Sequence, residues 1–125
     1  MTTNRWVMIG SATGFVGVAM GAFGTHALAR AYSEKTVAIW QTGAQYQMYH
    51  ALAIIGFGIW SGLHPNSTDK LPGWAFTVGT ALFSGSLYLL ALTDIKELGA
   101  ITPIGGLALM LGWLTFALSA FRYRK

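Results

Sequence analysis

The 125-residue sequence contains no cysteine, which excludes disulfides, thiol chemistry and metal sites held by cysteine. Charged residues are also scarce: they make up 10% of the chain, whereas an average soluble domain carries roughly a quarter. Hydrophobic residues, by contrast, account for 54%. A soluble domain of this size could not bury so much apolar surface. The composition therefore argues against an ordinary soluble fold and indicates a membrane protein.

The few charged residues leave four long uncharged segments between them. These segments lie between Arg5 and Arg30, Lys35 and Asp69, Lys70 and Asp94, and Glu97 and Arg122. Each exceeds the ~18–20 residues that a helix needs to cross ~30 Å of hydrocarbon, and a helix satisfies its own backbone hydrogen bonds there. The sequence therefore predicts one all-α membrane domain over residues 1–125. We expect a four-transmembrane-helix bundle with helices at about 6–28, 40–62, 73–93 and 99–121.

Four spans place both termini on one side of the membrane. The cations on that side are Arg5, Lys70, Arg122, Arg124 and Lys125, and those on the other side are Arg30, Lys35 and Lys96. Because loops rich in Lys and Arg stay in the cytoplasm, we expect both termini to be cytoplasmic. Trp6, Trp60 and Trp74 are expected at the same interface. The basic C-terminal RYRK segment fits this orientation signal, so we predict no nucleic-acid partner.

Small residues recur at alternating spacings of three and four in the first and fourth predicted helices. They are Gly10, Gly14, Gly17, Gly21 and Gly24 in the first, and Gly105, Ala108, Gly112, Thr115 and Ser119 in the fourth. Such stripes let helices approach closely in lipid, where the hydrophobic effect contributes little to helix association. We therefore predict two packing seams that dock on each other, within one chain or between subunits. A glycine-lined pore or cofactor groove is the alternative.

The second predicted helix begins with polar side chains along one face. They are Gln41, Thr42, Gln45, Tyr46, Tyr49 and His50, with Gln47 just off this face. A polar face inside a membrane should turn toward other helices or a watery cavity. Other polar residues at comparable depth are His26, Ser84, Ser86, Tyr88 and Thr102. We therefore predict a polar cluster near the outer leaflet, centred on His50, Tyr46 and His26.

This cluster has two interpretations: a hydrogen-bond network between helices, or a cavity that binds a lipid, quinone or other small amphiphile. The predicted ligand-binding residues are His26, Gln45, Tyr46, Tyr49, His50, Ser84 and Tyr88. Catalysis is not expected, because Asp94 and Glu97 lie in a loop and the predicted spans contain no carboxylate.

Metal and cofactor sites are also not predicted. The sequence has three histidines and no dependable fourth metal ligand. A predicted depth difference of about 12 Å between His26 and His50 argues against a haem held within one chain. A proton-coupled exporter would need an acidic residue inside the membrane, and the predicted spans have none.

Four motifs in order carry a family resemblance: GAFGTHAL at 21–28, YQMYHALA at 46–53, FSGSLYLLAL at 83–92 and ITPIGGLALMLGW at 101–113. They resemble the DUF423 family, also called UPF0382, whose eukaryotic counterparts are known as transmembrane protein 256. Thr25 stands where an alanine is expected. The resemblance covers nearly the whole chain and implies a four-helix protein of the bacterial inner membrane. It implies no activity, substrate or catalytic residue.

Two functions follow as hypotheses. The first is a non-enzymatic membrane protein whose polar outer cavity binds a lipid or small amphiphile. The second is a structural or assembly subunit, either a homo-oligomer or an accessory of a larger membrane complex. A transporter or channel would need a continuous polar path, and the apolar inner halves of the predicted helices argue against one.

Overall fold

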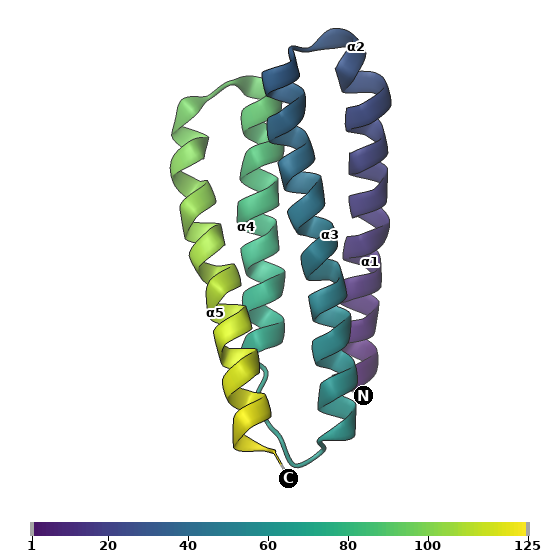
Figure 1. The fold of residues 1–125 in the computed structure, drawn as a ribbon, viewed down its shortest axis with the longest axis vertical. Helices are drawn as coiled ribbons and strands as arrows, with labels where there is room; N and C mark the ends of the chain where they lie inside the picture. The colour runs from purple at the N-terminus through teal and green to yellow at the C-terminus, as the bar shows by residue number, and fades with distance from the viewer. Residues whose placement is uncertain (1, 125) are drawn as a thin grey trace.

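The computed structural model describes residues 2–124, and within this range every regular element is helical. The long helices are α1 (Thr2–Phe23), α3 (Glu34–Leu63), α4 (Leu71–Thr93) and α5 (Ile101–Arg122). Shorter elements join them: a π-helix η1 (Gly24–Leu28), α2 (Ala29–Ala31) and a 3₁₀-helix η2 (Lys96–Ala100). The start of α1 and the end of α5 lie at the same end of the bundle, here called the terminal end (Figure 1). The opposite end is called the distal end.

Local signals in the sequence explain where the central helices begin and end. The Ser33 side chain accepts a hydrogen bond from the Thr36 backbone N–H at 3.2 Å, so α3 begins at Glu34 rather than near Trp40. Pro72 stands in the first turn of α4, where its missing N–H costs nothing. Asp94 ends α4 in the left-handed conformation, with φ 57°.

Three helical segments of the described chain are long and apolar enough to cross a membrane: Thr3–Ala31, Leu71–Thr93 and Lys96–Arg122. The all-helical character expected from the sequence is confirmed. Helix α3 is the longest at 30 residues, but the polar side chains between Gln41 and His50 lower its hydropathy. The fourth span and the side on which the termini lie stay predictions.

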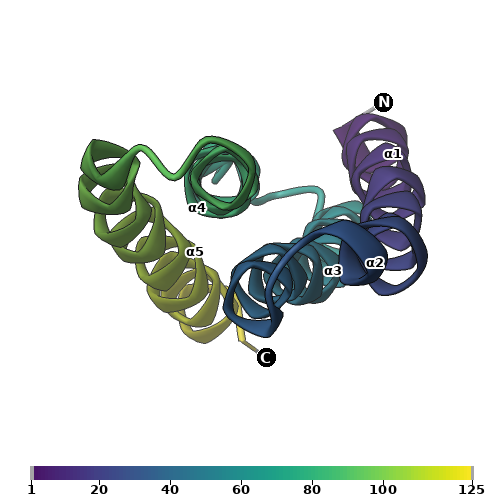
Figure 2. The ribbon, with the colours of Figure 1, turned by 90° about the horizontal axis from the view of Figure 1, so that it is seen from above.

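The helices pack in the order α1, α3, α4, α5. Figure 2 shows α1 and α5 on opposite sides of the arrangement, with α3 and α4 between them. The expectation that the first and last helices dock through their small-residue stripes is therefore wrong within one chain. The stripe of α1 faces α3, and that of α5 faces α4. Helices adjacent in the sequence pair here, as short connections favour.

The α1 stripe packs tightly on α3 only at its two ends, whereas the α5 stripe packs tightly on α4 at both of its glycines. A Cβ atom at Gly10 would lie 2.5 Å from the Ile55 side chain, and one at Gly24 would lie 2.7 Å from the Trp40 ring. Between them, Gly14, Gly17 and Gly21 leave room for a Cβ at ordinary contact distance. On α5, a Cβ at Gly105 would collide with the Phe83 backbone, and one at Gly112 would lie 2.6 Å from the Phe76 ring. Ala108 is half-buried.

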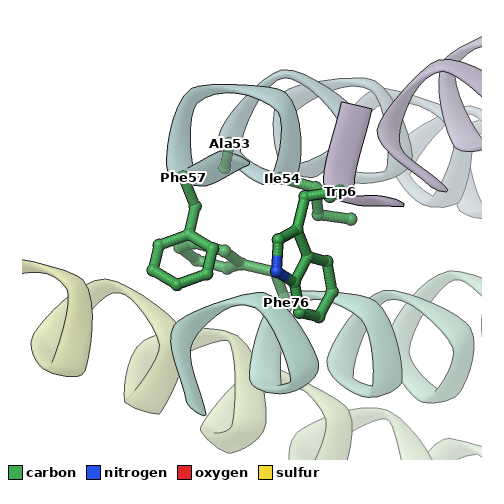
Figure 3. Packing of buried hydrophobic residues seen from close by; sticks show 5 residues of the cluster. All are labelled: Trp6, Ala53, Ile54, Phe57 and Phe76. Carbon is green, nitrogen blue, oxygen red and sulfur yellow. The ribbon is translucent and has the colours of Figure 1, made fainter. Parts of the chain in front are cut away.

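The main apolar core lies near the terminal end and consists of Trp6, Ala53, Ile54, Phe57 and Phe76 (Figure 3). Trp6 is only 1% exposed, because its ring packs on Gly73 and its Cβ on Gly58, and neither glycine has a side chain to exclude it. Trp6 therefore packs inside the bundle, and its depth at the membrane interface stays a prediction. A second cluster of Leu28, Trp40 and Ala91 holds the distal end together.

Candidate functional site

The predicted site residues do not form one cluster, because α3 presents its polar side chains on two different sides. Ser84 and Tyr88 of α4 meet Gly43 and Gln47 of α3. Tyr46 and His50 face Phe83 of α4 and Trp113 of α5, and Gln45 and Tyr49 bond each other on the adjoining surface of α3. His26 stands apart from both groups, exposed in η1 near the distal end.

The first group is a hydrogen-bond network joining α1, α3 and α4. Tyr88 Oη donates to Gln47 Oε1 at 2.6 Å, and Gln47 Nε2 donates to the Thr13 carbonyl at 2.9 Å. Ser84 Oγ donates to the Gly43 carbonyl at 2.6 Å. Gln47 is the link that the sequence prediction set aside. Its spacing from Ala44 and Ala51, three and four residues, places it on the seam that packs against α1.

A groove of about 380 Å³ lies over this network, between α1 and α4. Its lining residues are Ala12, Thr13, Val16, Gln47, Thr77, Thr80, Ala81, Ser84, Gly85 and Tyr88. No charged side chain is among them. The groove is thus largely apolar, and the hydrogen-bonded side chains of Gln47 and Tyr88 are among its lining residues.

Thr80, in the groove lining, is unusual among the threonines of the described helices. Five others donate their hydroxyl to the carbonyl four residues earlier: Thr13, Thr42, Thr77, Thr93 and Thr115. Thr80 is 7% exposed, and its Oγ1 has no hydrogen-bond partner among the residues described. A buried hydroxyl left without a partner costs roughly 1–3 kcal/mol, so it calls for an explanation.

His50 is buried, and both of its ring nitrogens are occupied. Nδ1 lies 2.7 Å from the Tyr46 carbonyl oxygen, and Nε2 lies 3.0 Å from Trp113 Nε1, which donates to it. Because Nε2 accepts, the proton of the neutral ring is assigned to Nδ1, which donates to the carbonyl. In this arrangement His50 ties α3 to α5 and leaves no lone pair for a metal or a substrate.

The other members of the second group reach the surface of the bundle. Gln45 is exposed, while Tyr46 and Tyr49 are 39% and 49% exposed. Gln45 Nε2 donates to Tyr49 Oη at 2.6 Å, and the two tyrosine rings lie 5.5 Å apart. We call Gln45, Tyr46 and Tyr49 the α3 polar patch.

At the distal end, side chains of α3 bond the last turns of α1 and the π-helix that follows. A π-turn interrupts the regular hydrogen-bond ladder of a helix. Trp40 Nε1 donates to the Met20 carbonyl at 2.7 Å, and Gln41 Nε2 donates to the Gly21 carbonyl at 3.1 Å. Gln41 also donates to Thr25 Oγ1 at 2.9 Å. The hydroxyl of Thr25 therefore binds α3, and His26 is left at the surface.

Comparison with known proteins decides the family. Residues 20–106 match the family described as "Protein of unknown function (DUF423)". The chain belongs to the DUF423 family. It is 42% identical to a UPF0382 membrane protein of Staphylococcus haemolyticus, over 94% of this chain and 96% of the relative. The predicted family resemblance is confirmed.

Other relatives of this DUF423 protein are similar over nearly their whole length. The UPF0382 membrane protein YwdK of Bacillus subtilis is 38% identical, over 94% of this chain and 97% of the relative. The UPF0382 inner membrane protein YgdD of Escherichia coli is 36% identical, over 98% and 95%. Together with the apolar helices, these relatives confirm the predicted location in the bacterial inner membrane. No solved structure matches the chain.

Proposed function

We propose that this DUF423 protein is a non-enzymatic, four-span membrane protein that holds a membrane amphiphile in the groove between α1 and α4. The groove supports this proposal most directly. Its volume of about 380 Å³ falls within the range of roughly 300–1,000 Å³ that is common for small-molecule sites. Its walls are formed by small or branched apolar side chains such as Ala12, Val16 and Ala81. Such walls suit a hydrocarbon chain.

The polar residues of the groove favour a ligand with a neutral headgroup. Thr80 lies nine residues along α4 from Leu71, which places it about 13.5 Å from the start of the helix. A charged group at this depth would lose its hydration without gaining an ionic partner, since no charged side chain lines the groove. A carbonyl or hydroxyl group costs far less to bury. The Thr80 hydroxyl, unpartnered among the residues described, is the group in the lining that we expect to bond it.

The number of cations at each end of the bundle favours one orientation in the membrane. At the terminal end there are four described cations, Arg5, Lys70, Arg122 and Arg124. At the distal end there are three, Arg30, Lys35 and Lys96. We therefore propose that the terminal end faces the cytoplasm.

Filling the groove at Gly85 tests the proposed site. A Cβ atom at Gly85 would meet nothing within 4 Å, so Gly85→Leu should place its side chain in the groove without disturbing the fold. Gly56→Leu is the matched control, because Gly56 is equally open but lies outside the groove. The probe is a sixteen-carbon alcohol that carries a photoreactive diazirine, added to proteoliposomes. We expect labelling of α1 and α4 peptides in the wild type and in Gly56→Leu.

Gly85→Leu should reduce this labelling about tenfold or more, because the side chain occupies the space of several chain carbons. Thr80→Val keeps the shape of the side chain and removes only the hydroxyl. It should weaken labelling by the alcohol, while labelling by a diazirine alkane of equal length stays unchanged. Equal labelling of Gly85→Leu and Gly56→Leu on α1 and α4 would show that the groove is not the site.

A further inference from the structure

The α3 polar patch lies at the middle depth of the helix bundle. The ring of Tyr46 lies 4.9 Å from the ring of Phe83, and Phe83 is close to the centre of α4. Tyr49 follows about one turn nearer the terminal end. If α4 crosses the bilayer, the patch is surrounded by hydrocarbon, which offers no hydrogen-bond partner.

The patch has more hydrogen-bonding capacity than this chain satisfies. Within residues 2–124, neither Tyr46 Oη nor Gln45 Oε1 takes part in a hydrogen bond, and Tyr49 Oη only accepts one from Gln45. The tyrosine hydroxyls can therefore each donate one more bond, and the Gln45 amide oxygen can accept. Polar groups that face lipid without partners are costly, so a surface of this kind is expected to be covered.

The chain does not cover the patch itself, because α5 leans away from α3 toward the distal end (Figure 2). The two helices meet through side chains nearer the terminal end, where Trp113 bonds His50 and Phe116 packs on Phe57. Tyr46 lies one turn nearer the distal end than His50, and Gln45 and Tyr49 lie beside it on the surface of α3. The three side chains are exposed in the described chain.

We propose that a second copy of this chain covers the α3 polar patch, so that the protein forms a two-fold symmetric dimer through α3. The patch is complementary to itself. The Gln45 amide and the tyrosine hydroxyls each offer both a donor and an acceptor, so the same side chains from two copies satisfy one another. The patch is uncharged, so two copies bring no like charges together in the low dielectric of the membrane.

Cysteine cross-linking tests which surface is the interface. The natural chain has no cysteine, so a single introduced cysteine reports one position without background. Leu52 is 63% exposed on α3, three residues from Tyr49, and is not one of the hydrogen-bonding side chains. Leu52→Cys should form a disulfide-linked dimer when membranes are oxidised with copper phenanthroline. Phe15→Cys is the control, since Phe15 is 78% exposed on α1, the helix farthest from α5. Cross-linking through Phe15→Cys but not through Leu52→Cys would overturn the proposal.

Removal of the hydrogen-bonding groups tests why the copies associate. The double variant Gln45→Leu with Tyr49→Phe keeps the side chains' size and removes an amide and a hydroxyl. Single-molecule photobleaching in liposomes should show dimers of the wild type, and the dissociation constant should rise about tenfold or more in the double variant. Thr115→Val is the control, because the Thr115 hydroxyl already bonds its own helix, and it should leave the dimer unchanged.

Three results would contradict the proposed dimer. One is a monomeric wild type at every protein-to-lipid ratio. Another is an unchanged dimer in the double variant. The third is a monomer from which native mass spectrometry detects a bound small molecule that the double variant loses, because a ligand would then cover the patch. These readouts do not depend on the groove, so the dimer and the amphiphile site can fail separately.

Discussion

At the scale of single residues, this chain uses its few polar side chains mainly to join helices. His50 illustrates this role. It was predicted as the centre of a ligand site, yet both of its ring nitrogens are hydrogen-bonded, one to the Tyr46 carbonyl and one to the Trp113 indole. The sequence indicated that these polar groups lie on one helix, and the structure places them on α3. Their partners could not be predicted, because a partner depends on the rotation of each helix about its axis.

The bond between Trp113 and His50 should contribute measurably to stability. Trp113→Phe keeps an aromatic ring and removes the N–H that His50 Nε2 accepts. We expect the free energy of unfolding to fall by about 0.6–1.5 kcal/mol, measured by SDS titration in mixed micelles. Trp74→Phe is the control: Trp74 is exposed to a similar degree, and its indole N–H makes no hydrogen bond within residues 2–124. An equal loss in both variants would assign the effect to ring size.

At the scale of helices, the small-residue stripes were predicted as packing seams but were paired with the wrong neighbours. The spacing of small residues shows that one face of a helix has no large side chains. It does not show which other helix packs against that face. The α3 polar residues show the same limit. Gln45 and Gln47 are two positions apart, and this separation turns one toward solvent or lipid and the other into the network with Tyr88. Only the packed arrangement decides between them.

Adjacent glycines on α5 allow a sharp test of the α4–α5 seam. A Cβ at Gly105 would collide with the Phe83 backbone, which cannot move aside without displacing α4. Gly105→Ala should therefore destabilise the protein by about 1–3 kcal/mol. A Cβ at Gly106 would lie 3.7 Å from the Phe83 ring, an ordinary contact, so Gly106→Ala should be neutral or slightly stabilising. Thermal unfolding in detergent compares the two. A harmless Gly105→Ala would mean that the seam is looser than the structure indicates.

At the scale of the whole molecule, the fold is an open row of helices with a different kind of surface on each side. The groove between α1 and α4 is apolar and concave, whereas the α3 patch is polar and exposed. The terminal end is fastened by Asp69, which accepts hydrogen bonds from Ser119 at 2.6 Å and from Arg122 at 2.7 Å. This contact ties the loop before α4 to the end of α5. The groove is lined by residues of α1, α3 and α4, and the patch lies on α3. Both proposed surfaces therefore depend on the packing of α3 against α4.

The number of spans determines where the two termini lie, and this can be measured directly. Three spans would place the termini on opposite sides of the membrane, whereas four place them on one side. The structure brings the start of α1 and the end of α5 to the same end of the bundle (Figure 1). Because four described cations lie at that end and three lie at the distal end, we expect both termini in the cytoplasm. Fusions of green fluorescent protein to either terminus should fluoresce, and matching alkaline phosphatase fusions should be inactive. An active phosphatase at one terminus alone would mean that α3 does not cross the membrane.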